Sequence, residues 1–272
     1  MQRLLGHIIH KSPHPEGDAI VLEHHGTRYL HIGSDAIQSA MDLLKPDYLK
    51  LTYTQHMMGV FLFIPPPKHC LLFGLGGGAL AKYLLAQYQD VKIDAIEIRQ
   101  DIINIAHSHF FVPHDKRLAI QNTDAHIFAL TSAKQGRTKY DLILVDAYDQ
   151  HGMVASTQQT IFLECCAQLL QPEGCLVLNT WARTSQQLKD LLAQLAEVFD
   201  QPPLCLPVPE KGNIIVFISH KSISPQMLKQ HKKKAKLLEQ QFDLPFSRYL
   251  KDLIKHNSKS WLHNFLSNKL FN

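Results

Sequence analysis

Residues 70–97, with the sequence CLLFGLGGGALAKYLLAQYQDVKIDAIE, hold a glycine loop followed by an acidic residue. The apolar run 70–73 predicts a buried strand. It leads directly into a loop with three alternating glycines: Gly74, Gly76 and Gly78. Glycines let a strand turn tightly into a helix and let a bound nucleotide approach the backbone. The segment 79–89 has helical apolar spacing, and the next apolar run ends on Glu97, whose carboxylate is placed to accept hydrogen bonds from ribose hydroxyls. We therefore expect the chain to bind a ligand that contains a nucleoside.

The loop pattern by itself does not identify that nucleoside. It satisfies both G-x-G-x-G, which ends at Gly78, and G-x-G-x-x-A, which ends at Ala79. The first pattern suits an adenosyl sulfonium and the second a dinucleotide. Each motif also has a purely structural alternative. The loop could be only a tight turn, and Glu97 could only cap a helix near Gln100.

Composition narrows the class of protein. The 272 residues, 45% hydrophobic and 19% charged, suit one large α/β domain with a small accessory part. No apolar run approaches the roughly 18 residues that span a bilayer, and the first residues lack a signal-peptide core. The five cysteines show no paired spacing, which predicts reduced thiols and a cytoplasmic protein without membrane contact. The seventeen histidines are scattered, so we expect no metal site.

The first part of the chain predicts a small β-rich domain, residues 1–55. Two short strands are expected at 19–24 and 27–32, whereas 34–44 has no clear period. A helix is expected over 52–63, before three consecutive prolines.

Residues 56–219 predict a Rossmann-like catalytic domain in which strands and helices alternate. The expected strands are 70–74, 92–97, 118–121, 141–146, 174–180, 203–208 and 213–219. The expected helices are 78–89, 100–109, 125–133, 156–170 and 185–199. Alternation favours a parallel sheet covered on both faces, but only a few residues join the last two strands, which permits an antiparallel hairpin alone. The fold class is therefore α/β, a class I methyltransferase-like Rossmann fold with a seven-stranded, mostly parallel sheet.

A third acidic position follows the expected strand 118–121. Asp124, with Ala125 after it, would lie in the same crevice as the glycine loop and could accept a hydrogen bond from an adenine amino group. The alternative is that Asp124 only caps the next helix. A dinucleotide dehydrogenase has no particular need of this acid, so its presence favours an adenosyl sulfonium.

A pair of acids follows the expected strand 141–146. Asp146 and Asp149 lie three residues apart on a loop over the reactive end of the ligand. Two such acids suit a cationic amine, because one can hold it while the other removes its proton. A purely structural acid pair is the alternative.

These motifs, in this order and spacing, resemble the polyamine aminopropyltransferases, the spermidine synthase family. The resemblance covers residues 19–219 and rests on the segments 74–78, 97–98, 124–125 and 146–149. Gln38 and Tyr53 extend it more weakly into the first domain. Members transfer an aminopropyl group from decarboxylated S-adenosylmethionine to a diamine or polyamine and release 5′-methylthioadenosine.

The resemblance implies a role for each position. Glu97 would bind the ribose and Asp124 the adenine, and the neighbouring Ile98 and Ala125 would also contact the cofactor. Gln38 would lie near the thioether. On the acceptor side, Asp146 would be the catalytic base, with Tyr53 and Asp149 holding the amine. We also expect the chain to form a homodimer.

The chain departs from the family pattern on the side of the amine. Gly77 stands where the family's loop carries an aspartate, and Gln150 where a proline is usual. The helix signature is altered at 53–57, and the linker 208–212 lacks a tyrosine. A methyltransferase that uses intact S-adenosylmethionine is therefore an alternative function.

Residues 220–272 predict a basic helical extension outside the core. This extension contains eleven Lys or Arg against three acidic residues, a charge of +8 within a chain of +4. Such a tail could bind nucleic acid, although a run of lysines is more often a solvated helical face. A non-catalytic nucleoside-binding or nucleic-acid-binding protein is thus a third possibility.

Overall fold

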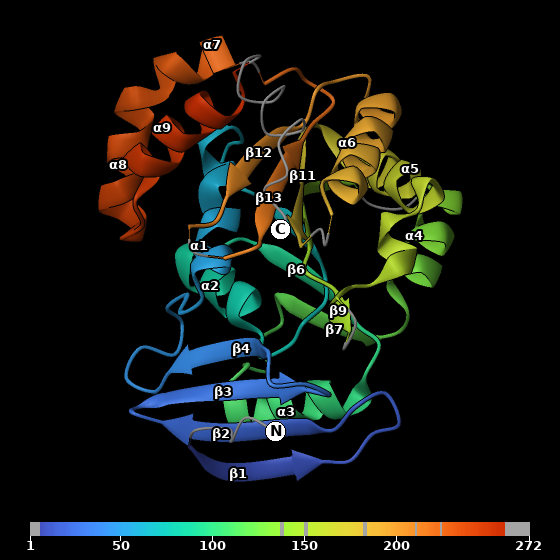
Figure 1. Ribbon diagram of the computed structural model, residues 1–272, viewed down its shortest axis with the longest axis vertical. Coiled ribbons are helices and arrows are strands. Elements are labelled where there is room, and N and C mark those ends of the chain that lie inside the picture. Colours follow the sequence, from blue (N-terminus) through green and yellow to red (C-terminus); the bar gives the residue numbers. More distant parts are fainter. Residues whose placement is uncertain are drawn as a thin grey trace.

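The computed structural model describes residues 6–136, 139–149, 152–181, 184–209, 211–223 and 225–258. Within these ranges an antiparallel sheet at the N-terminal end lies below a larger mixed sheet, and helices cover both faces of the larger sheet (Figure 1). The helices found there include none that is long and apolar enough to cross a membrane.

The N-terminal sheet has four antiparallel strands in the order β1-β2-β3-β4. They are β1 (His7–Ser12), β2 (Ala19–His24), β3 (Thr27–Ile32) and β4 (Ile37–Asp42). The predicted strands β2 and β3 are confirmed, and the stretch 34–44 contains β4. The sequence analysis missed β1, because this edge strand is mostly exposed and has no clean alternation of apolar and polar residues.

The larger sheet has seven strands in the order β12-β13-β11-β8-β5-β6-β7. Their bounds are β5 (His69–Phe73), β6 (Lys92–Glu97), β7 (Leu118–Asn122), β8 (Tyr140–Val145), β11 (Leu170–Thr180), β12 (Leu204–Pro207) and β13 (Ile214–Ile218). The five strands from β11 to β7 are parallel, and the β12–β13 hairpin is antiparallel. The predicted fold class is confirmed.

Two apolar cores flank this sheet because successive side chains of a strand point to opposite faces. Leu72 faces one core, to which α1 (Thr52–Met57), the 3₁₀ turn η1 (Met58–Leu62) and α2 (Ala79–Gln87) contribute. Leu71 and Phe73 face the other, which is covered by α4 (Ala125–Lys134), α5 (Thr160–Leu169) and α6 (Ser185–Phe199). The helix α3 (Gln100–Phe110) joins the larger sheet to the N-terminal one. A 3₁₀ turn, η2 (Ala155–Gln158), precedes α5, so that helix begins later than predicted.

The part of the C-terminal extension that the structure describes, up to residue 258, is helical as predicted, but its helices belong to the core. They are α7 (Pro225–Leu228), the 3₁₀ turn η3 (Lys229–His231), α8 (Lys232–Phe242) and α9 (Phe246–His256). Phe242, Phe246 and Tyr249 are buried in the same cluster as η1 and β12. Asn257 donates to the carbonyl of Cys205 and accepts from its amide.

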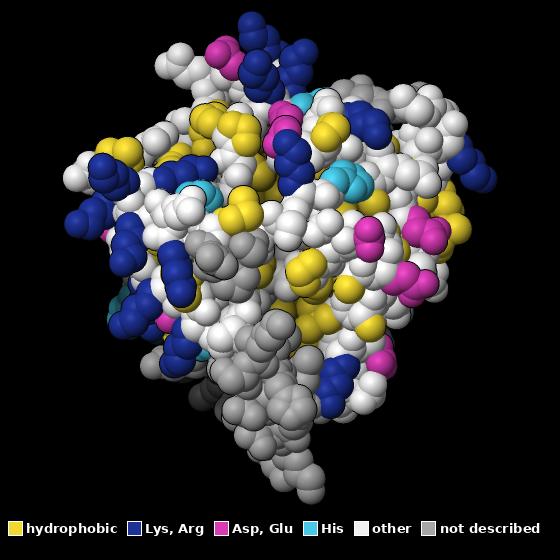
Figure 2. All heavy atoms as spheres, turned by 90° about the horizontal axis from the view of Figure 1, so that it is seen from above, with side chains coloured by type: hydrophobic (Ala, Val, Ile, Leu, Met, Phe, Trp, Pro, Cys, Tyr) yellow, Lys and Arg dark blue, Asp and Glu magenta, His cyan; other side chains and the backbone are white. Residues whose placement is uncertain are grey.

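The sequence analysis placed the extension outside the core because it is rich in lysine and arginine. An amphipathic helix shows its lysines on one face while it buries apolar residues on the other. The lysines and arginines gather on the left side of Figure 2, over α8 and α9. These helices therefore have both a basic outer face and an apolar inner one.

Candidate active site

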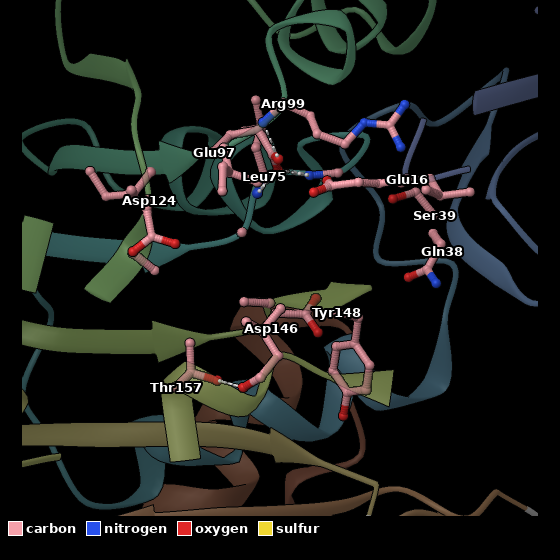
Figure 3. Close-up of a pocket in the computed structure, with 18 of the residues that line it drawn as sticks. Glu16, Gln38, Ser39, Leu75, Glu97, Arg99, Asp124, Asp146, Tyr148 and Thr157 are labelled. Carbon is pink, nitrogen blue, oxygen red and sulfur yellow. Dashed lines mark hydrogen bonds between the residues drawn. The ribbon is translucent and has the colours of Figure 1, made fainter. Parts of the chain in front are cut away.

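A cavity of about 370 Å³ opens at the carboxyl ends of β5, β6 and β8, where the N-terminal sheet meets the larger one. This is where a doubly wound sheet binds its ligands. Nine of the predicted site residues line it: Gln38, Tyr53, Gly74, Gly76, Glu97, Ile98, Asp124, Ala125 and Asp146. In Figure 3, Glu97 and Asp124 lie on one side of the cavity and Asp146 lies across from them.

Gly78 is a predicted site residue that does not line this cavity. It forms the N-terminal cap of α2, and a Cβ there would lie 2.2 Å from Val112 Cγ2. It therefore supports the glycine loop from behind. The backbone of Asp149 belongs to the short strand β9 (Tyr148–Asp149), which pairs with β10 (Gly152–Met153), and its side chain lies outside the described part of the structure.

The glycine loop approaches β8 more closely than a side chain would allow. Gly74 has φ +93°, and a Cβ on it would lie 2.4 Å from the carbonyl oxygen of Asp146. Glycine relieves both the strain of this φ and the clash. The loop can therefore lie directly beside the strand end that carries Asp146.

Glu97 is held by backbone amides at the end of β6. Its Oε2 accepts from the amides of Leu75 (3.0 Å) and Gly76 (3.4 Å), and its Oε1 from the amide of Arg99 (3.0 Å). Burial raises the pKa of Glu97, and the three amides partly offset that rise. The carboxylate thus has a fixed position next to the loop.

Asp124 caps α4, as the plainer reading of its position predicted. Its Oδ1 accepts from the amides of His126 (2.8 Å) and Ile127 (2.9 Å). No donor to its Oδ2 is found among the described residues, and Asp124 also lines the cavity. Capping and ligand contact are therefore compatible.

Asp146 is mostly buried and is held by two side chains. Tyr53 OH donates to its Oδ2 (3.1 Å) and Asn179 Nδ2 to its Oδ1 (2.8 Å). Burial raises the pKa of Asp146, while the bonds from Asn179 and Tyr53 lower it. A carboxyl that faces a cavity, with a raised pKa and fixed orientation, is suited to remove a proton.

The sequence of this chain matches the family model described as the spermine/spermidine synthase domain over residues 50–231. The chain belongs to the spermine/spermidine synthase family. It is 32% identical to a polyamine aminopropyltransferase of Chromobacterium violaceum over 89% of this chain and 92% of that protein. The resemblance seen in the sequence is confirmed.

Solved structures show the same fold. A spermidine synthase in complex with the transition-state analogue AdoDATO has a TM-score of 0.71 and 14% identity, over 96% of this chain and 88% of that one. Human methyltransferase-like protein 13, in complex with SAH, has a TM-score of 0.61 and 24% identity, over 74% and 93%.

Gly77 shows why this member of the synthase family carries glycine in the loop. Its amide donates to Ser39 Oγ (2.8 Å), and a Cβ on it would lie 2.8 Å from Phe110 Cδ1 and 2.9 Å from Ser39 Cβ. The N-terminal sheet and α3 thus close the space that an aspartate side chain would need.

Glu16 is a cavity residue that the sequence analysis missed. It lies between β1 and β2, and Figure 3 shows it beside Ser39 with its carboxylate directed into the cavity. Arg99 Nη1 anchors this loop by donating to the carbonyl of Gly17 (2.8 Å), while its guanidinium pairs with Asp101. No local motif marks Glu16, because its place depends on this contact across 82 residues.

Ser39, Arg99 and Thr157 also line the cavity and were not predicted, and Tyr148, from the segment 146–149, lines it as well. Within the described ranges, no group of three or more His, Cys, Asp or Glu side chains is placed to bind a metal ion. All five cysteines are free and buried.

Proposed function

We propose that this chain transfers an aminopropyl group from decarboxylated S-adenosylmethionine to a diamine or polyamine and releases 5′-methylthioadenosine. The observation that carries the proposal is Asp146, a mostly buried carboxyl held between Tyr53 and Asn179 across the cavity from Glu97. A base and a nucleoside-binding carboxylate thereby face the same cavity. Its volume of about 370 Å³ is within the range of about 300–1,000 Å³ for small-molecule sites.

At the nucleoside end, Glu97 accepts hydrogen bonds from the ribose hydroxyls and Asp124 accepts one from the adenine amino group. The free Oδ2 of Asp124 and the fixed carboxylate of Glu97 support these roles. The exposed side chain of Ile98, which also lines the cavity, gives the adenine ring an apolar surface. Gln38 lies on the N-terminal side of the same cavity and contacts the thioether.

The glycine loop favours the decarboxylated substrate over the intact one. Each of the five amides of residues 74–78 already has an acceptor. In chain order the acceptors are Ile96 O, Glu97 Oε2 for two successive amides, Ser39 Oγ and Leu75 O. A ligand carboxylate would find no free loop amide, and the cavity already contains the acidic residues Glu16, Glu97, Asp124 and Asp146. Arg99, the arginine that the described residues contribute to the lining, is paired with Asp101. An anionic cavity of this kind prefers a ligand without a carboxylate.

At the other end, Asp146 removes a proton from the acceptor ammonium, and Asp149 holds the amine. Deprotonation is needed because an ammonium has a pKa near 10 and no lone pair. The nitrogen then forms a bond to the aminopropyl methylene carbon while the carbon–sulfur bond breaks and its electrons go to sulfur. The chain contributes orientation and exclusion of water, because the sulfonium is already a good leaving group.

Product analysis tests this function. The purified chain is incubated with decarboxylated S-adenosylmethionine and a panel of diamines and polyamines, and the products are separated by mass. We expect equimolar 5′-methylthioadenosine and an acceptor extended by one aminopropyl group, and neither product with Asp146→Asn. Absence of both products with every acceptor would refute the proposal.

A methyltransferase that uses intact S-adenosylmethionine is the second candidate. The closed space at Gly77 favours it, because the loop lacks the aspartate with which the family holds the amine substrate. Calorimetry with the intact and the decarboxylated compound separates the two functions. Tighter binding of the intact form, together with a methylated product, would replace the first function by the second.

We also propose that the chain works as a cytoplasmic homodimer. Five buried free thiols suit a reducing compartment, and the exposed side chains of Leu44 and Tyr48 offer apolar surface near β4. Sedimentation velocity measures the assembly, and a monomer at micromolar concentration would refute it.

The basic outer face of α8 could bind nucleic acid, and binding that weakens as salt concentration rises is the test of this.

A further inference from the structure

Asn179 binds Asp146 from a different element and in a buried position. It lies near the end of β11, 33 residues after Asp146, and its side chain is 2% exposed. The bond from Asn179 Nδ2 to Asp146 Oδ1 is 2.8 Å long. A buried amide can present either its donor or its acceptor to a neighbour, so the orientation of Asn179 matters for the charge of Asp146.

Asn213 fixes that orientation. Its Nδ2 donates to Asn179 Oδ1 over 2.9 Å. Because Asn179 Oδ1 already accepts this bond, the NH₂ group of Asn179 is the part that faces Asp146. Antiparallel pairing of Thr180 with Ile214 places Asn213, which immediately precedes β13, beside the end of β11. Tyr148 OH donates a further hydrogen bond to the backbone carbonyl of Asn179 (2.8 Å).

A fixed donor stabilises the ionised form of a carboxyl. Asn179 and Tyr53 fill one acceptor site on each oxygen of Asp146, which leaves the other sites for an ammonium. The two donors thus favour the form that can accept a proton, although burial acts against it. Asn213, between β12 and β13, is thereby linked to Asp146 through Asn179.

We propose that Asn179 and Asn213 form a positioning pair that keeps Asp146 ionised and aimed into the cavity. The inference rests on the proposed function only for the identity of the amine whose proton Asp146 accepts. The protonation of Asp146 itself can be measured without any substrate.

The first test is a carboxyl-carbon NMR titration of the full chain, with the Asp146 signal assigned from its absence in Asp146→Asn. In Asn179→Leu, which has a similar volume and no donor, we expect the Asp146 pKa to rise by about one to two units. Asn213→Leu leaves the Asn179 amide free to rotate, so we expect a smaller rise. Asn104→Leu, on the exposed side of α3, is the matched control and should leave the titration unchanged.

The second test is the pH dependence of kcat/KM for aminopropyl transfer. Asp146 must be ionised to accept a proton, so activity is lost as pH falls through its pKa. A higher pKa in Asn179→Leu therefore moves the acidic limb to higher pH by the same one to two units. A purely structural role would lower the rate without moving this limb, and that outcome would overturn the proposal.

The two proposals fail in different ways. A wild-type chain that transfers no aminopropyl group refutes the function but leaves the NMR shift as a test of the pair. Transfer by the wild type with an unchanged Asp146 titration in Asn179→Leu refutes the pair alone. If Asn179→Leu does not fold, Asn213→Leu, whose side chain is only partly buried, tests the pair instead: a rise in the Asp146 pKa supports it and no change overturns it.

Discussion

Glu97 and Asp146 lie on opposite sides of one cavity, and the chain holds these two carboxylates in different ways (Figure 3). The donors to Glu97 are backbone amides, of Leu75, Gly76 and Arg99. The donors to Asp146 are side chains, those of Tyr53 and Asn179, which are 93 and 33 residues away.

The two carboxylates therefore differ in how a single substitution near them can affect them. A backbone amide is present whatever the side chain, so the position of Glu97 depends on the loop conformation alone. A side-chain donor can be removed by a single substitution, so the ionisation of Asp146 depends on which residues surround it. We therefore expect changes at the Glu97 side to alter binding, and changes at the Asp146 side to alter rate and pH dependence.

The largest effect is expected for Asp146→Asn. Loss of a general base lowers kcat by about 10²–10⁴-fold, while the affinity for 5′-methylthioadenosine should stay within a factor of about two. Steady-state rates and calorimetry measure the two quantities, with Asp190→Asn on the exposed face of α6 as the control. A similar loss of nucleoside affinity would show that the two sides are not separate.

A smaller effect, on binding, is expected for Glu97→Gln. Charge-assisted hydrogen bonds are worth about 1.5–3 kcal/mol, so nucleoside affinity should fall by about 10- to 100-fold. The acidic limb of the pH profile should stay where it is, because Asp146 keeps both of its donors. Calorimetry and a pH–rate profile are the measurements, and the exposed Glu164→Gln on α5 is the control. A shift of the acidic limb in Glu97→Gln would contradict the expectation that Glu97 affects binding alone.

Gly77→Asp tests whether the loop can be given the acid that the family carries there. The new side chain meets Phe110 and Ser39, so we expect the free energy of unfolding to fall by about 1–3 kcal/mol with no gain in amine affinity. Denaturant unfolding measures the change, and Gly77→Ala should show a smaller loss. Adding Phe110→Leu should recover part of it, since neighbouring substitutions are coupled. A stable Gly77→Asp with tighter amine binding would show that the space is open.

The smallest effect is expected for Glu16→Gln. This exposed carboxylate faces the cavity from the N-terminal side, so its loss should raise the KM for the amine-bearing substrates a few-fold and leave kcat unchanged. The difference should shrink at high salt, because salt screens an exposed charge. Equal KM values for the wild type and Glu16→Gln at low salt would show that Glu16 takes no part in substrate binding.

The sequence predicted most of the larger sheet and much of the nucleoside side. Strands β5 to β8 are apolar runs that end in a loop or an acid, and the three alternating glycines marked the turn into α2. It also predicted Asp146 as a cavity residue, from its place at a strand end. It did not predict β1, the environment of Asp146 or the packing of α8 and α9 in the core.

What the sequence by itself determined is local. A strand, a glycine turn and an acid at a strand end depend on residues within a few positions of one another, so their pattern can be read along the chain. The tertiary structure alone decided that Asn179 and Tyr53 meet at Asp146, that Phe110 closes the space beside Gly77, and that Arg99 holds the loop of Glu16. Each of these contacts joins residues far apart in the chain. It exists only because the sheets pack together, and no period or spacing in the sequence encodes such a contact.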